Sequence, residues 1–417
     1  MRNALSPLAR IIVALAAVLG LLAVAVPAEA VINSVTVVPS ANTSPTEDNS
    51  FASVSCVSAS WCVAVGYFEN GNSNQTLIEL WDGSSWSIQP SPNTSPTEDN
   101  SLGGVSCVST TWCVAVGNSY DGTTSQTLIE VWDGTNWTIQ TSANTSPTED
   151  NQLYSVSCTS VSSCVAVGDF YNGWLQTLVQ VWDGNSWSLQ ASPNSSATET
   201  NYLFAVSCVS SSWCVAVGAF MRVGRNQPMA QVWNGSNWSM QSAPSFSPTE
   251  DNYLEALSCV SASWCVAAGA HTINNEDVYE TMVQVWDGST WSMQASPSTS
   301  QTESNYLFGM SCLSVSFCVA VGEYHDNDYS TSTYQRSLVE VWDGSAWTIQ
   351  PSPSPGPQVR TNMNSVSCVS DWQCSAVGDY LDGTFKTLVL ALTGPEPPTT
   401  TTTSAPPADP VVPAFTG

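Results

Sequence analysis

Basic residues are scarce in this chain of 417 residues. It contains 7 Lys and Arg against 34 Asp and Glu, which gives a formal net charge of −27 at pH 7. A surface this acidic repels phosphate backbones and anionic lipids. The composition therefore all but excludes nucleic-acid binding, and it leaves solubility or attraction of divalent cations as roles for the acidic excess.

Unpaired cysteine is also lacking, because all 14 cysteines fall into seven pairs with five residues between partners. In an exported chain, two cysteines that flank a short turn between adjacent strands predict a disulfide. A structural metal–thiolate site takes four ligands, which two cysteines per repeat do not supply. The predicted disulfides are Cys56–Cys62, Cys107–Cys113, Cys158–Cys164, Cys208–Cys214, Cys259–Cys265, Cys312–Cys318 and Cys368–Cys374.

Residues 1–30 indicate export. Arg2 and Arg10 precede an apolar run, and Ala28-Glu29-Ala30 fits a small-x-small cleavage site, as in secretion signals. An uncleaved membrane anchor is the alternative, because the run is near the shortest length that spans a bilayer. We expect removal near Val31, no membrane insertion afterwards, and an extracellular protein that is secreted or attached to the cell surface.

Residues 395–417 form a Pro/Thr-rich tail. The tail is too poor in apolar residues to bury a core, so we expect a disordered stalk or linker. Its end, AFTG, resembles the Thr-Gly sorting signals that attach exported proteins to cell walls. The apolar segment and basic tail that follow such signals are not in this sequence, so an accidental match and a truncated chain both stay open.

Residues 31–394 consist of repeats of one unit. The unit reads VSCVSASWCVAVG at Val54–Gly66 and continues as TLIELWDGSSWSIQPS at Thr76–Ser91, and its first cysteine recurs seven times at intervals of 50 to 56 residues. This interval is the period of propeller blades. The pattern predicts an all-β, seven-bladed β-propeller with four antiparallel strands in each blade.

The four strands of the first unit differ in their pattern. We expect the first at Phe51–Cys56, a second at Trp61–Phe68 that is apolar enough to be covered on both faces, and a third at Thr76–Trp81. Asp82-Gly83 opens a tight turn, and Trp86–Ser91 alternates apolar with polar residues, which is typical of a strand with one wet face.

The two ends of the repeat region predict how the ring closes. The seventh unit has a third strand at Thr387 but no WDGSSW turn and no fourth strand. Asn33–Ser50 aligns without a gap on Ser84–Ser101, which holds a fourth strand and its exit loop. We therefore expect the N-terminal strand to complete the last blade, because closure removes open sheet edges. A linear solenoid is the alternative.

The order of a strand ending in glycine (CVAVG), a variable loop, an apolar strand (LIELW), an Asp-Gly turn and a tryptophan strand (WSIQPSP) resembles a kelch-type blade, as in secreted bacterial propellers. Kelch blades carry Gly-Gly where this chain has Val65-Gly66, and they lack the cysteine pair. WDGSSW is similar, more weakly, to the Asp-box turn of sialidase-like propellers. Both resemblances imply the fold, and propellers host many activities.

The predicted loops between blades carry a repeated acidic motif, SPTEDN, first at Ser44–Asn49. Pro, Asp and Asn satisfy backbone groups in turns, which predicts a structural role. The alternative is calcium, which takes hard oxygen ligands shared between loops. The candidate calcium ligands are Glu47, Asp48, Glu98 and Asp99.

The loops between second and third strands emerge on the same face as the interblade loops, and they are where the repeats differ most. Variable loops on a repeated scaffold predict a ligand surface, here over blades four to six, with drift as the alternative. Arginine suits a carboxylate or sulfate, and aromatic rings beside polar groups suit a sugar. The candidate ligand-binding residues are Arg222, Arg225, His271, Tyr324, His325, Asp326, Asp328, Tyr329, Tyr334, Arg336 and Arg360.

We interpret the chain as a monomeric binding or adhesion module that recognises a glycan or another extracellular protein. No residue is nominated as catalytic, because the face holds too many acids to single out a pair. A glycoside hydrolase or lyase that acts on an acidic polysaccharide is the first alternative. A purely structural surface protein is the second.

Overall fold

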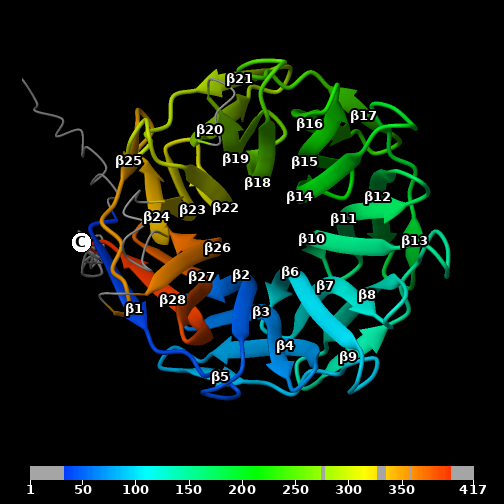
Figure 1. Cartoon of the computed structure of the whole chain (residues 1–417), viewed down its shortest axis with the longest axis vertical. Coiled ribbons are helices and arrows are strands. Elements are labelled where there is room, and N and C mark those ends of the chain that lie inside the picture. Colours follow the sequence, from blue (N-terminus) through cyan, green and yellow to red (C-terminus); the bar gives the residue numbers. More distant parts are fainter. Residues whose placement is uncertain (1–31, 274–277, 326–334, 357–358, 396–417) are drawn as a thin grey trace, which may run out of the picture.

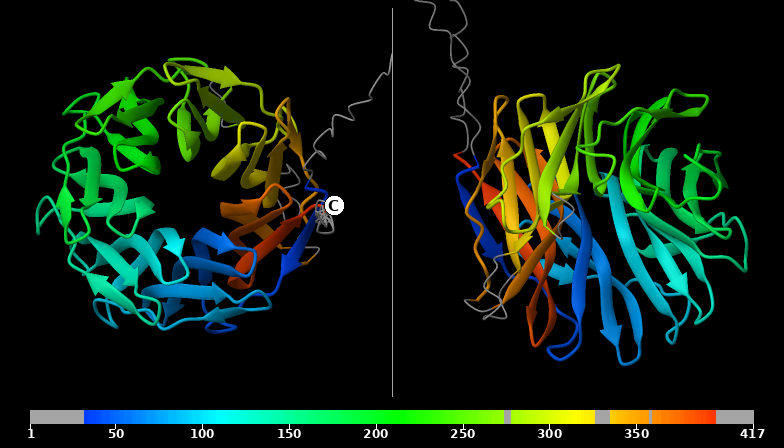
Figure 2. Two further views of the ribbon diagram at one scale, coloured as in Figure 1. Left: turned by 180° about the vertical axis from the view of Figure 1, so that it is seen from behind. Right: turned by 45° about the horizontal axis from the view of Figure 1, so that its top comes forward.

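The computed structural model describes residues 32–273, 278–325, 335–356 and 359–395. They form seven four-stranded antiparallel sheets arranged as blades around a central axis (Figures 1 and 2). No helix occurs among the described residues, and none of these residues therefore forms a helix that could cross a membrane. The predicted all-β, seven-bladed propeller is confirmed.

The strands of each blade are ordered outward from the axis. The innermost strands are β2 (Asn49–Ser58), β6 (Asp99–Ser109), β10 (Asn151–Ser160), β14 (Asn201–Ser210), β18 (Asn252–Ser261), β22 (Asn305–Ser314) and β26 (Arg360–Ser370). The second strands are β3 (Trp61–Asn70), β7 (Trp112–Tyr120), β11 (Ser163–Tyr171), β15 (Trp213–Arg222), β19 (Trp264–Thr272), β23 (Phe317–His325) and β27 (Gln373–Asp382). The third strands are β4 (Ser73–Trp81), β8 (Ser125–Trp132), β12 (Leu175–Trp182), β16 (Arg225–Trp233), β20 (Tyr279–Trp286), β24 (Gln335–Trp342) and β28 (Thr384–Thr393). The outermost strands are β5 (Trp86–Ile88), β9 (Trp137–Gln140), β13 (Trp187–Leu189), β17 (Trp238–Gln241), β21 (Trp291–Gln294), β25 (Trp347–Ile349) and β1 (Ser34–Val38).

The N-terminal strand closes the ring as predicted. β1 pairs antiparallel with β28, from Ser34 opposite Thr393 to Val38 opposite Val389, and Figure 1 shows these two strands side by side. Ile32 is fully buried at the start of this strand. The last blade therefore obtains its outer strand from the other end of the chain, and its third strand is not left as a free edge.

The outer strands are shorter than the alternation in the sequence suggests. β5 ends at Ile88, three residues before the predicted end at Ser91. Pro90 has no backbone N–H to continue the ladder. Gln89 still donates its N–H to the carbonyl of Ile78, at 2.8 Å, so pairing stops one residue before the proline.

The glycine that ends each CVAVG strand packs against the inner strand of its own blade. In the first blade a Cβ on Gly66 would collide with the carbonyl oxygen of Ser50. The same collision recurs at the equivalent glycine of every other blade. The repeated glycine is therefore required by the close approach of two backbones.

The core lies between blades. Seven apolar clusters each combine side chains of two neighbouring blades, as where Val63, Val65 and Ile78 of the first blade meet Leu102 of the second. The tryptophans of each WDGSSW-type turn pack against each other, with ring centroids 5.8 Å apart for Trp81 and Trp86. Burial of these faces is the main stabilising term for the ring.

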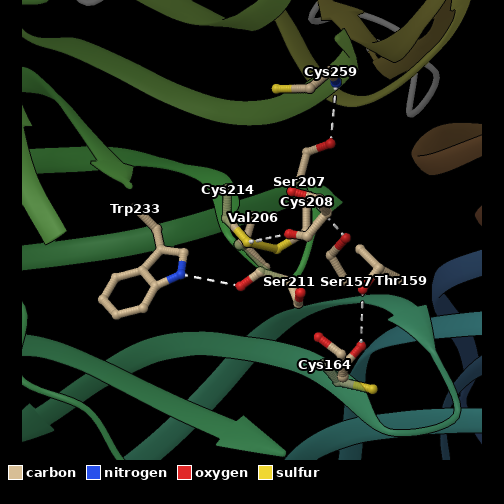
Figure 3. The surroundings of a disulfide bond; sticks show 12 residues. Ser157, Thr159, Cys164, Val206, Ser207, Cys208, Ser211, Cys214, Trp233 and Cys259 are labelled. Atoms are coloured by element: carbon tan, nitrogen blue, oxygen red, sulfur yellow. Dashed lines mark hydrogen bonds between the residues drawn. A yellow bond between two sulfur atoms is a disulfide. The ribbon is translucent and has the colours of Figure 1, made fainter. Parts of the chain in front are cut away.

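All seven predicted disulfides are present, one in each blade, and no cysteine is free. Each blade is also tied to the next, because the N–H of its first cysteine donates to a serine Oγ of the preceding inner strand. Figure 3 shows two of these bonds, from Cys208 to Ser157 at 3.0 Å and from Cys259 to Ser207 at 3.1 Å. Multiple disulfides suit an oxidising compartment.

Candidate functional site

Two sets of loops meet at one end of the propeller, which we call the loop face. These are the turns between the second and third strands and the loops that lead from one blade to the next. They are bonded together: Asn74 at the start of β4 donates its N–H to Asp99 in the following interblade loop, at 2.7 Å. Glu69 donates its N–H to the carbonyl of Asp48 in the preceding loop, also at 2.7 Å.

The acidic interblade motif supports these loops. Asn49 accepts the N–H and the hydroxyl of Thr43 through Oδ1, both at 2.9 Å, which closes the loop on itself. Asp48 Oδ1 accepts the N–H of Phe385 at 2.8 Å, and Glu47 Oε1 accepts that of Gly71 at 3.2 Å. These hydrogen bonds support the predicted structural role of the motif in turns.

The candidate calcium ligands take part in the same support. Asp99 and Asp48 accept hydrogen bonds from backbone N–H groups. Glu98 Oε2 accepts a hydrogen bond from the hydroxyl of Thr94, at 3.3 Å. Within the described residues no group of three or more His, Cys, Asp or Glu side chains is placed to hold a metal ion. Calcium binding at Glu47, Asp48, Glu98 and Asp99 stays a prediction.

The predicted ligand-binding residues that the structure describes lie at the loop face but do not converge on one point. Arg225 forms an ion pair with Asp251, with Nη1 2.9 Å from Oδ2. Arg222 is exposed at the turn between β15 and β16, where it lies opposite Arg225. Arg360 begins β26. Four other predicted residues, Asp326, Asp328, Tyr329 and Tyr334, lie outside the described residues.

Several predicted residues occupy one recurring cross-strand pair. In the first, third and fourth blades this pair is a phenylalanine opposite a glutamine, as at Phe68 and Gln75. In the fifth blade it becomes His271 opposite Glu280, and in the sixth Tyr324 opposite Arg336. In these two blades charged groups therefore stand where the first, third and fourth blades are uncharged, and the seventh blade carries Tyr380 opposite Lys386 there.

The histidines of the two blades point in different directions. His271 is 4% exposed and stacks on Phe246, with ring centroids 3.7 Å apart. Burial lowers the pKa of His271 below its usual value. The His325 side chain instead has its Nε2 3.0 Å from Oε1 of Glu323 and its ring 5.7 Å from that of Tyr306. Tyr324, between them in sequence, packs against the core of the fifth and sixth blades.

The central channel is lined by residues that bulge out of the inner strands. In every inner strand the pairing register shifts by one residue, as between Phe51 and Ser53, and the extra residue faces the axis. These residues contribute to a cavity of about 200 Å³. In chain order they are Ala52, Gly103, Tyr154, Phe204, Glu255, Phe308 and Asn364.

An arc of aromatic rings lies at the loop-face mouth of this channel. Tyr202, Tyr253 and Tyr306 occupy the second position of three successive inner strands. Tyr279, at the start of β20, links two of them, with ring centroids 6.4 Å from Tyr253 and 4.9 Å from Tyr306. All four tyrosines are half-buried, so part of each ring faces solvent. Deeper rings continue the arc, with Phe204 5.3 Å from Tyr202 and Phe308 5.8 Å from Tyr306.

Carboxyl groups accompany the arc. Desolvation in the channel, followed by the negative charge of Glu323, raises the pKa of Glu255 to about 7. Glu323 is 7% exposed and accepts hydrogen bonds from Gln335 Nε2 through both oxygens, at 3.0 and 2.9 Å. Burial likewise raises the pKa of Asp379 to about 6, although its Oδ2 accepts the hydroxyl of Ser50 at 2.7 Å. Acidic groups whose pKa values are spread in this way are typical of functional sites.

A second buried acid extends the site to the third blade. Asp169 is 2% exposed, and burial raises its pKa to about 6. Tyr154 donates its hydroxyl to Asp169 Oδ2 at 2.7 Å, and burial together with that carboxylate raises the pKa of Tyr154. The phenol therefore stays protonated at physiological pH and acts as a hydrogen-bond donor.

Most of this channel site was missed by reasoning from the sequence. Its signal lay in the inner strands and not in the loops: the second position reads Ser50 and Ser101 in the first two blades but Tyr202, Tyr253 and Tyr306 in the fourth to sixth. The inner strands are otherwise repeated, so a change at their solvent-exposed end indicates a surface that differs between blades.

Exposed aromatic side chains also gather on the loop face. Among the described residues, every aromatic side chain counted as exposed lies in or beside its loops. By contrast, the opposite end exposes aliphatic residues such as Val161 and Val315. The exposed aromatic residues of the loop face are Tyr120, Tyr171, Trp174, Phe246 and Phe385.

The chain matches no protein-family model and no curated protein. Among solved structures it is similar to a protein of unknown function from Dyadobacter fermentans, at 9% identity and a TM-score of 0.48, over 86% of this chain and 97% of that one. It is also similar to the six-bladed propeller lectin of Aleuria aurantia, crystallised for its fucose recognition (14% identity, TM-score 0.47, 75% of this chain and 99% of that one). A third similar structure is the Trypanosoma rangeli sialidase in complex with sialic acid, at 12% identity and a TM-score of 0.42, over 69% of this chain and 53% of that one.

These similarities concern the fold alone. The chain is a seven-bladed propeller, and the structure that shows this is its own. The narrower resemblance to kelch blades stays a prediction.

Proposed function

We propose that the protein is a glycan-binding module whose ligand sits at the loop-face mouth of the channel. The observation that carries this proposal is the arc of half-buried tyrosines, Tyr202, Tyr253, Tyr279 and Tyr306, three of which stand where the first two blades carry serine. A repeated scaffold gains nothing in core packing from such partly exposed rings. Their placement is explained by a ligand that stacks on them.

The polar groups beside the arc favour a neutral or basic sugar. Carboxylates such as Glu323 and Asp379 accept hydrogen bonds from hydroxyl groups, as a polyhydroxylated ligand requires. A sulfated or uronic-acid chain would face these acids and the net charge of −27. The arginines that the sequence offered for anionic ligands support this further, because Arg225 is already paired with Asp251.

The setting of the proposed module is the cell exterior. The leader at residues 1–30 and the seven disulfides support export, and the Pro/Thr-rich tail supports attachment to a cell wall or presentation on a stalk. An extracellular protein partner is the other ligand class that the loop face suits, with calcium as a structural ion of its acidic loops.

Binding to an array of neutral, amino and acidic glycans tests the proposal. Tyr253→Ser and Tyr306→Ser restore the residue found at Ser50 and Ser101, so both variants should fold, and each should weaken binding at least tenfold. Ile139→Ser, on the outer face of β9, is the matched control. Absence of any glycan ligand, or unchanged binding in both tyrosine variants, would overturn the proposal.

A glycoside hydrolase is the second candidate, and Glu255 with Glu323 is the observation that favours it. The two acids interact, and Glu255 has a pKa of about 7, as a general acid needs. In that case Glu255→Gln would abolish turnover of a bound oligosaccharide while leaving its binding in place. Binding without turnover in the unmodified protein identifies the module as non-catalytic.

A further inference from the structure

A second pocket lies at the rim of the loop face, away from the channel cavity, around the loops that enter and leave the fifth blade. It has a volume of about 560 Å³. Phe246 and Glu250 come from one interblade loop, His271 and Glu280 from the paired strands β19 and β20, and the next interblade loop supplies the remaining wall. The lining residues are Phe246, Glu250, His271, Ile273, Glu280, Gln301 and Thr302.

Three of these residues depart from the repeat, and the departures meet here. Phe246 occupies a position of the interblade loop that is threonine before each of the first three blades, at Thr43, Thr94 and Thr145. His271 replaces a phenylalanine that recurs in three other blades. Glu280 replaces a glutamine that in four blades donates to the next loop, as Gln227 does to the carbonyl of Glu250 at 3.0 Å.

The phenylalanine is presented as a platform. Phe246 keeps the backbone bond of its loop, from its N–H to Asn252 Oδ1 at 2.9 Å. Its ring stacks on the buried His271 with an interplanar angle of 17°, and the residue stays 52% exposed. One face of the ring is therefore fixed by protein, and the other is left open to a ligand.

The polar groups around the platform are acceptors. His271 Nδ1 is 3.0 Å from the carbonyl of Thr272, and a carbonyl accepts only, so Nδ1 carries the proton and Nε2 presents a lone pair. Nε2 lies 3.8 Å from Glu280 Oε2, which is beyond hydrogen-bond distance. Glu250 and Glu280 both act electrostatically on this imidazole, and none of the described lining residues is Lys or Arg.

We infer that this rim pocket binds the protonated amine of a ligand. An aromatic face, a buried lone pair and two carboxylates together offer a cation–π contact, an ion pair and acceptors for the three N–H groups of an ammonium ion. The same chemistry is presented by an amino sugar and by a lysine side chain. This inference does not depend on the glycan site at the channel.

Calorimetric titration of the full chain at pH 6 with three probes tests the inference. The probes are a glucosamine oligosaccharide, its fully N-acetylated counterpart, and Nα-acetyl-lysine amide, whose side-chain amine is free. Either amine-bearing probe should bind, and the N-acetylated oligosaccharide should bind at least tenfold more weakly than the free amine. A preference between glucosamine and lysine identifies the source of the ammonium group.

Variants that restore the repeat keep the test independent of folding. Phe246→Thr, His271→Phe and Glu280→Gln each install a residue that other blades carry at the same position, and Phe246→Thr and Glu280→Gln should each weaken amine binding at least fivefold. Ile139→Ser, at an exposed position of β9 in the second blade, is the control and should leave amine binding unchanged. No amine binding, equal binding of the acetylated probe, or full affinity in both variants would overturn the inference.

Discussion

The backbone N–H of Cys56 donates a hydrogen bond to Ser367 Oγ at 3.0 Å, although 311 residues separate the two. The same bond, from the first cysteine of a blade to a serine of the preceding inner strand, recurs at every other interface with lengths of 3.0 to 3.1 Å. The interface between the seventh and first blades, which depends on the pairing of β1 with β28 from the other end of the chain, thus has the same bond as the other six.

This equivalence predicts the effect of removing the serine. Ser367→Ala leaves the N–H of Cys56 without its acceptor and should lower the free energy of unfolding by about 1 kcal/mol. Ser157→Ala, which removes the acceptor of Cys208, should cost the same. Denaturant melts of both variants provide the measurement. A full cost for Ser157→Ala with none for Ser367→Ala would mean that the ring is open in solution.

The closing strand itself gives a second prediction. Removing residues 32–40 exposes the backbone edge of β28 and takes Ile32, which is 0% exposed, out of the core of the last blade. The truncated protein should melt at lower temperature and self-associate, because an exposed apolar edge strand pairs with other chains. Light scattering and thermal melts follow both effects.

A synthetic peptide of residues 32–41 provides the control for truncation. Added in excess, it should restore the monomer by pairing with β28, as an added strand does in other sheets. The same peptide with Val35→Asp should not, because Val35 packs against the core of the last blade. Equal rescue by both peptides would contradict a specific register.

Ring closure was accessible from the sequence because it rests on an alignment of the chain with itself. The segment around Ser34–Val38 matches other outer strands, and the seventh repeat lacks one. The channel site was not accessible in this way. Phe308 faces the axis because it is the extra residue of a bulge between Leu307 and Gly309, and a one-residue shift of this kind cannot be read from hydrophobic periodicity.

The same limit applies to the predicted ligand residues. His271 and His325 were grouped because both follow a CVAVG-type strand in a variable region. Their positions differ by one residue relative to the glycine, with His271 two residues after Gly269 and His325 three after Gly322. Side chains alternate along a strand, so one ring packs on Phe246 and the other lies beside Tyr306.

The repeated glycine yields a third prediction. Gly66→Ala should cost several kcal/mol, because the new methyl group meets the carbonyl of Ser50 and the two strands cannot separate without breaking their ladder. Gly71→Ala is the comparison: its φ of 73° strains an alanine, but nothing lies within 4 Å of the added carbon, so about 1 kcal/mol is expected. Comparable melting temperatures for the two variants would refute the packing explanation.

A buried carboxyl gives the last prediction. Glu79 is 0% exposed in the middle of β4, where Oε2 accepts the N–H of Ala41 at 3.2 Å and Oε1 has no partner. The third blade carries Gln180 in the same place, which accepts from Ala143 at 3.1 Å and donates to Thr127 at 3.2 Å. Burial raises the pKa of Glu79 from 4.5 to about 8, so the folded protein holds a proton that the unfolded chain loses above pH 4.5.

The sign of the pH dependence follows from this difference. The stabilising contribution of protonated Glu79 is complete below pH 4.5 and is lost as the pH rises through about 8, at an upper limit of about 5 kcal/mol. Glu79→Gln removes this dependence, so the variant should match the parent near pH 4 and be more stable at pH 8. Gln180→Glu should do the reverse and lose stability as the pH rises. Chemical denaturation of the three proteins at both pH values measures the effect, and a constant difference between Glu79→Gln and the parent would show that Glu79 is ionised in the folded state.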